Sequence, residues 1–142
     1  MKHYTASRGW RNHNPLNIRR GANWQGLTSV QMDKDFCQFL NMTWGYRAAA
    51  VCMKSYYRLF VQRGLPFTVR NILNRWAPPS ENKTEAYIRN VSRLTGIAPD
   101  EPIGIPSEKP SRWMMLGVAM AIQENGTDSL DYFAMLRGWE MV

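Results

Sequence analysis

The sequence predicts a mainly helical α+β domain with a small antiparallel β hairpin region near its N-terminus. Short runs punctuated by glycine fill the segment before residue 40, whereas apolar residues recur every three or four positions in most of the chain after it. The length of 142 residues suits one ordinary domain, and the 44% apolar content suffices for a substantial core. We therefore expect a single domain over residues 1–142.

The predicted hairpin region extends from Asn17 to Phe39. Short runs such as Leu27 to Met32 are separated there by Gly21 and Gly26 with their polar neighbours. This pattern is typical of short strands joined by tight turns. We expect the region to form one wall of a cleft whose other wall is the segment from Trp76 to Tyr87, because both carry polar residues that a core does not need.

Two helices are predicted after the hairpin region. Between about Thr43 and Arg63, apolar residues follow the spacing of one buried helix face, and Gly64 is placed to end the helix. The same spacing predicts a short helix from Val69 to Trp76, which Pro78 and Pro79 would terminate.

Three further helices are predicted in the second half of the chain. The first contains Tyr87 to Leu94 and ends at Gly96. A loop from Ala98 to Pro110, rich in proline, separates it from a helix around Trp113 to Ile122. The apolar residues from Leu130 to Leu136 indicate the last of the three helices.

The chain is basic, with 18 Lys and Arg against 11 Asp and Glu and a net charge of +7. Such a surface should attract polyanions, namely nucleic acid, anionic membrane or an acidic cell-wall polymer. The longest apolar stretches fall well short of the roughly 20 residues of a membrane-spanning helix, so we expect no membrane insertion. Met1 to Arg20 has no apolar centre, so no secretory signal is expected.

No metal or cofactor is predicted. Cys37, Cys52, His3 and His13 lack the spacing of a zinc site. The chain also lacks a phosphate-binding glycine motif and a serine or cysteine in a nucleophile-elbow context. We expect both cysteines to be free thiols in the core.

Any catalytic carboxylate must lie after residue 32, because the first 32 residues contain no Asp or Glu. Hydrolysis of a glycosidic bond needs a protonated acid beside the leaving oxygen, and usually a second carboxylate that stabilises positive charge at the sugar carbon. Asp33, Asp35, Glu81 and Glu85 lie in segments expected to be ordered. Because Glu81 stands where a helix should begin, helix capping is its competing role.

The tryptophans divide into two groups. Trp44, Trp76 and Trp113 lie on apolar helix faces, which favours a place in the core. Trp10 and Trp24 stand among Arg, Asn and Gly, a setting typical of a binding surface.

Two segments carry a family resemblance. Asn14 to Arg19 reads N-P-L-N-I-R, and Arg75 to Tyr87 reads R-W-A-P-P-S-E-N-K-T-E-A-Y. W-x-G, F-x-x-F and G-x-R-A stand in order between them. The chain thereby resembles the "structural protein five" family of phage and prophage muralytic proteins and, more distantly, bacterial glucosaminidases and lytic transglycosylases. The resemblance implies a lysozyme-like fold and peptidoglycan as substrate.

The resemblance also implies a catalytic Glu on the helix before the hairpin, and this chain has no acid before Asp33. Three alternatives remain open. The acid has moved to Asp33 or Glu81, the chain cuts peptide cross-links, or it keeps the fold without the activity.

Our hypothesis is a peptidoglycan-degrading phage-type lysin with Glu81 as general acid and Asp33 as charge stabiliser. The substrate-binding residues would be Trp10, Asn14, Asn17, Arg19, Trp24 and Tyr87. We expect a monomer made in the bacterial cytoplasm, which acts at the cell wall after holin-type release or as part of a virion. The alternatives are a non-enzymatic phage structural or wall-binding module and, with least support, a nucleic-acid-binding protein, because no nucleic-acid motif accompanies the charge.

Overall fold

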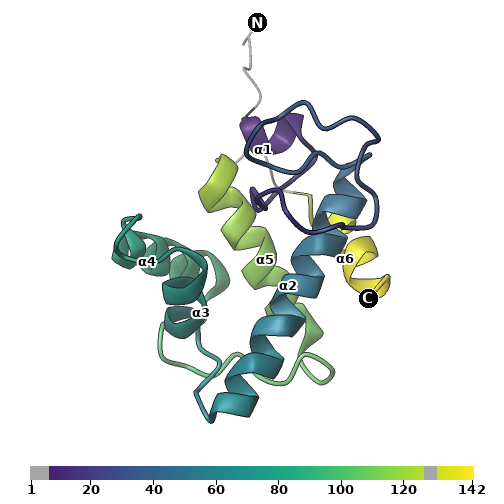
Figure 1. Cartoon of the computed structure of the whole chain (residues 1–142). Coiled ribbons are helices and arrows are strands. Elements are labelled where there is room, and N and C mark those ends of the chain that lie inside the picture. Colours follow the sequence, from purple (N-terminus) through teal and green to yellow (C-terminus); the bar gives the residue numbers. More distant parts are fainter. Residues whose placement is uncertain (1–6, 127–130) are drawn as a thin grey trace, which may run out of the picture.

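A computed structural model describes residues 7–126 and 131–142 of the chain (Figure 1). The helices of these residues are α1 (Arg8–Arg11), α2 (Met42–Arg63), α3 (Val69–Trp76), α4 (Thr84–Thr95), α5 (Pro110–Asn125) and α6 (Tyr132–Glu140). No helix within this part of the chain is both long and apolar enough to cross a bilayer.

The α+β prediction is wrong for residues 7–126 and 131–142, because these contain helices and no β-strand. The segment expected to be a hairpin belongs to an irregular stretch, residues 12–41, which we call the N-terminal loop. Its backbone pairs only at isolated bridges, which are antiparallel between Arg19 and Phe36 and between Leu27 and Phe39 and parallel between Arg20 and Ala22. The fold is therefore helical, with a long loop packed on one end of it (Figure 1).

Polar side chains in the N-terminal loop form hydrogen bonds with backbone N–H groups that would bond to the opposite strand in a hairpin. Oδ1 of Asp33 accepts the backbone N–H groups of Asp35 and Phe36, at 2.9 and 3.0 Å. Oε1 of Gln31 accepts the backbone N–H of Gln38 at 2.8 Å, and Gln38 in turn accepts that of Met32. Polar side chains can compete with a strand ladder in this way, so pairing does not extend beyond single bridges.

The predicted helices between Thr43 and Leu94 are confirmed, and each has a local cause. Asn41 caps α2 by accepting the backbone N–H of Trp44, and Gly64 ends it in the left-handed conformation at φ 65°. Thr68 caps α3 in the same manner, and Gly96 ends α4.

The remaining helices differ from the prediction at their boundaries. α5 begins at Pro110, earlier than its apolar pattern indicated, since proline suits the first helical position. α6 begins after Asp131, whose side chain accepts the backbone N–H of Ala134. Leu130, predicted to belong to this helix, lies outside the described residues.

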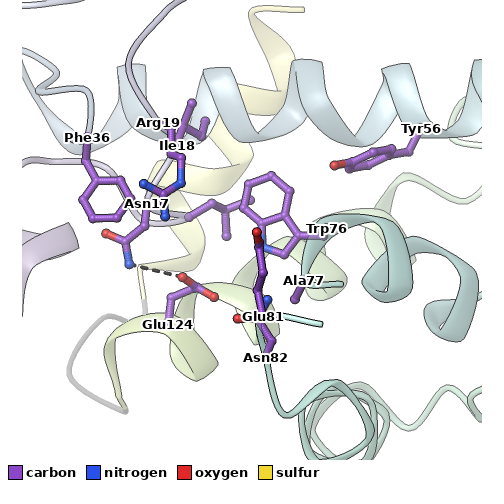
Figure 2. Close-up of a pocket in the computed structure, with 11 residues that line it drawn as sticks. Asn17, Ile18, Arg19, Phe36, Tyr56, Trp76, Ala77, Glu81, Asn82 and Glu124 are labelled. Atoms are coloured by element: carbon purple, nitrogen blue, oxygen red, sulfur yellow. Dashed lines mark hydrogen bonds between the residues drawn. The ribbon is translucent and has the colours of Figure 1, made fainter. Parts of the chain in front are cut away.

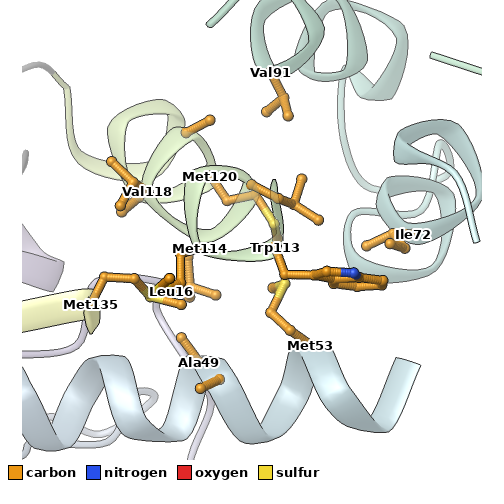
Figure 3. Close-up of a cluster of buried hydrophobic side chains, with 14 of the residues drawn as sticks. Leu16, Ala49, Met53, Ile72, Val91, Trp113, Met114, Val118, Met120 and Met135 are labelled. Atoms are coloured by element: carbon orange, nitrogen blue, oxygen red, sulfur yellow. The ribbon is translucent and has the colours of Figure 1, made fainter. Parts of the chain in front are cut away.

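The core forms where α5 packs against α2, α4 and α6. In Figure 1, α5 runs between α2 and the α3–α4 pair, while α1 and the N-terminal loop lie over one end. Figure 3 shows the buried cluster, in which Trp113 of α5 and Met53 of α2 are fully buried. Gly45 lets the start of α2 approach the loop closely, because a Cβ there would overlap the carbonyl oxygen of His13.

Both cysteines are free thiols, as predicted. Cys37 is buried and Cys52 is half-buried against the core. Burial raises the pKa of Cys52 to about 11, so the thiol is protonated at neutral pH and is a poor nucleophile.

Candidate functional site

A pocket of about 680 Å³ lies between the N-terminal loop and the segment that joins α3 to α4 (Figure 2). The loop contributes Leu16, Asn17, Ile18, Arg19 and Phe36; the other side contributes Trp76, Ala77, Glu81 and Asn82, with Tyr56 from α2 and Glu124 from α5. The expected cleft between residues 17–39 and 76–87 is therefore confirmed, although its first wall is a loop.

Glu81 lies in the turn between α3 and α4. Its backbone N–H donates to the carbonyl oxygen of Pro78 at 3.0 Å, which fixes the turn. The side chain is exposed and forms no hydrogen bond or ion pair with any other described residue. The N-cap of α4 is Lys83, and no side chain caps that helix within residues 7–126. Glu81 thus has no capping role, and its carboxyl group is available to a ligand.

Glu124 is the second carboxylate of the pocket, and the sequence analysis did not find it. It lies half-buried in the last turn of α5, and its Oε1 accepts a hydrogen bond from Nδ2 of Asn17 at 3.2 Å (Figure 2). One signal was available in the sequence. An acid in the last turn of a helix faces the negative end of the helix dipole, which is unfavourable.

Aromatic rings and a guanidinium group complete the pocket. Trp76 is half-buried and packs edge-on against Tyr56, with ring centroids 6.4 Å apart. The guanidinium carbon of Arg19 lies 5.1 Å from the centre of the Phe36 ring. Trp76 was expected in the core, and it does pack against the core, but it is only half-buried and also lines the pocket. Two carboxyl groups beside aromatic faces suit acid–base chemistry on a ligand that combines hydroxyl groups with flat apolar faces, as a sugar does.

Comparison with known proteins gives one clear relationship. No family model matches the chain. Protein P5 of Pseudoalteromonas phage PM2 is 34% identical to it over 139 residues, which cover 95% of this chain and 81% of the phage protein. The chain belongs to the P5 family of phage proteins. The phage character expected from the sequence is therefore confirmed.

The two asparagines predicted to bind substrate play different parts in this P5-family member. Asn14 is fully buried and ties the loop together, since its Nδ2 donates to the carbonyl oxygens of Ile18 and Cys37 at 2.9 and 3.0 Å. Asn17 lies in the pocket with a left-handed backbone, at φ 51°. Asn14 therefore shapes the loop, and Asn17 presents its amide to the pocket.

Asp33 lies outside the pocket lining, and its carboxylate is fully occupied. Arg8 donates to both of its oxygens, at 2.6 and 2.7 Å, and Asn12 donates at 3.0 Å. The Arg8 guanidinium, followed by the Asn12 amide, holds the pKa of Asp33 well below its usual range. These contacts assign Asp33 to the integrity of the N-terminal loop.

This role predicts a pH-dependent stability. Because the pKa of Asp33 is lower in the folded state, its stabilisation is present above the unfolded pKa of about 4 and is lost as the pH falls towards the folded value. Asp33→Asn should lower the melting temperature at pH 7, by a margin that narrows below about pH 4. Thermal melts of both proteins from pH 2.5 to 7 measure this margin, and a margin independent of pH would contradict the assignment.

The remaining predicted binding residues are divided between pocket and interior. Arg19 lines the pocket, whereas Trp10 and Trp24 do not belong to its lining. Trp24 packs against the core. Tyr87 is buried and lies outside the pocket lining, and its hydroxyl donates to the carbonyl oxygen of Met120 at 3.4 Å. Of the predicted set, the pocket thus gathers Asn17, Arg19 and Glu81.

Proposed function

We propose that the pocket binds the glycan strand of peptidoglycan and cleaves it by general acid catalysis. The observation that carries this proposal is that Glu81 and Glu124 line one pocket together with Trp76 and Tyr56. Glycoside hydrolysis commonly uses two carboxyl groups that flank the scissile bond. Figure 2 shows the two glutamates reaching into the pocket from different segments of the chain.

Glu81 is the proposed general acid. Its side chain is exposed and has no partner among the described residues, so its carboxyl group is free to approach a ligand. The half-buried ring of Trp76 would bind the apolar face of a sugar. Arg19, at the loop side of the pocket, would pair with carboxylates of the wall polymer.

The net charge of +7 supports the choice of polymer. Peptidoglycan and its associated wall polymers are anionic, and a cationic surface raises the local concentration of such a substrate. In this proposal the protein reaches the wall after holin-type release or as part of a virion. The wall-binding alternative uses the same pocket without bond cleavage.

Purified peptidoglycan sacculi provide the test. The unmutated protein should release soluble fragments, and mass spectrometry of these identifies reducing sugar ends, anhydro sugar ends or cleaved peptides. Glu108→Gln is a matched control, because Glu108 is exposed and lies outside the pocket. If the protein sediments with sacculi and leaves them intact, it is a wall-binding module and the proposal of an enzyme is wrong. Cleaved peptides alone would reject glycan cleavage.

A further inference from the structure

Glu124 and Asn17 are placed in a way that fold stability does not explain. Asn17 adopts a left-handed backbone, which asparagine takes more readily than most residues that carry a side chain. Its Oδ1 is buried without a hydrogen-bond partner among the described residues. Its Nδ2 meanwhile holds the carboxylate of Glu124, which lies at the unfavourable end of the α5 dipole. Buried polar groups without a partner are rare in native structures, and a catalytic role is one of their explanations.

Tyr87 is a buried neighbour of Glu124. Burial raises the pKa of Tyr87 well above its usual value, and the neighbouring charge of Glu124 raises it further. The Tyr87 hydroxyl therefore stays protonated at neutral pH, and it donates to the carbonyl oxygen of Met120. Glu124 is held by the amide of Asn17, and its carboxylate lines the pocket.

We propose that Glu124 is the second catalytic carboxylate of the pocket and stabilises positive charge at the sugar carbon while Glu81 acts as the acid. This inference rests on the proposed function. Glu124 takes the part predicted for Asp33, whose carboxylate is occupied by Arg8 and Asn12 outside the pocket.

The reaction balances with water as co-reactant. Glu81 transfers its proton to the glycosidic oxygen, and the bond between that oxygen and the sugar carbon breaks with its electron pair on the oxygen. The ionised carboxylate of Glu124 stabilises the cationic sugar carbon that results. Water then forms a bond to this carbon and gives a proton to Glu81, which restores both carboxyl groups.

The test compares Glu124→Gln and Glu124→Ala with the unmutated protein on purified sacculi. Glu124→Gln should lower the initial rate of fragment release at least tenfold with little change in melting temperature, because an amide oxygen can still accept the bond from Asn17. In Glu124→Ala, sodium azide should restore part of the rate and form a glycosyl azide, since the small anion occupies the place of the lost carboxylate and attacks the sugar carbon.

The outcomes separate this inference from the proposed function. An unmutated protein that releases no fragments overturns both. An active unmutated protein whose Glu124→Gln variant keeps the full rate overturns the role of Glu124 alone. A loss of rate in Glu124→Ala without azide rescue and without a glycosyl azide product shows that Glu124 is only structural, and it also overturns the inference.

Discussion

Glu81→Gln is expected to lower the turnover of peptidoglycan about a hundredfold or more, without loss of folded protein. The glutamine side chain has nearly the same size as glutamate, but it cannot deliver a proton at neutral pH. The Glu81 side chain is exposed and caps no helix within residues 7–126, so the substitution removes no contact that stabilises the fold. Initial rates of fragment release from sacculi measure the effect, and melting temperatures monitor the fold.

Two further variants test whether the loss of turnover is specific to Glu81. Glu108→Gln removes an exposed acid outside the pocket and should leave the rate unchanged. Asp33→Asn should alter stability rather than the rate per folded molecule at neutral pH, because Asp33 lies outside the pocket. Full activity in Glu81→Gln would remove Glu81 from the mechanism.

Trp113→Ala should destabilise the protein by about 3 to 5 kcal/mol, as truncation of a buried aromatic side chain does. Trp113 is fully buried, and Figure 3 shows it in the central cluster with Met53 and Ile72. Its indole N–H donates to the carbonyl oxygen of Gly104 at 2.9 Å, so the ring also holds the loop before α5. Urea denaturation followed by circular dichroism measures the free energy of unfolding.

Trp113→Phe is the matched control for that measurement. Both variants leave the carbonyl of Gly104 without its donor. Because Trp113→Phe keeps an aromatic ring in the core, its loss of stability should be smaller than that of Trp113→Ala. Equal free energies of unfolding in the alanine variant and the unmutated protein would mean that the cluster around Trp113 is not the core.

The helices could be predicted where local chemistry determines them. α2, α3 and α4 combine apolar spacing with a residue that ends the helix, and Gly64 and Gly96 stand at two of these ends. α1 was missed because its four residues are too few to show a periodic pattern. The N-terminal loop was mistaken for a hairpin because its pairing is decided by side chains such as Asp33, whose partners in the fold include the distant Arg8.

The candidate site was predictable only in part. Glu81 and Asn17 stand in polar stretches that no core would use, and both line the pocket. Glu124 could not be placed from the sequence, because its contact with Asn17 joins positions 107 residues apart. Trp76 has the apolar spacing of a core residue, and it packs against the core while it also lines the pocket.

Because the backbone of Asn17 is left-handed, the residue that favours stability at this position differs from the one that favours activity. Glycine would adopt φ 51° without strain, so Asn17→Gly relaxes the loop, yet it deletes the amide that orients Glu124. Variants selected for heat resistance should therefore accept glycine at position 17, whereas variants selected for wall digestion should retain asparagine. Two libraries randomised at codon 17, one screened for heat resistance and the other for wall digestion, should therefore yield different residues at this position.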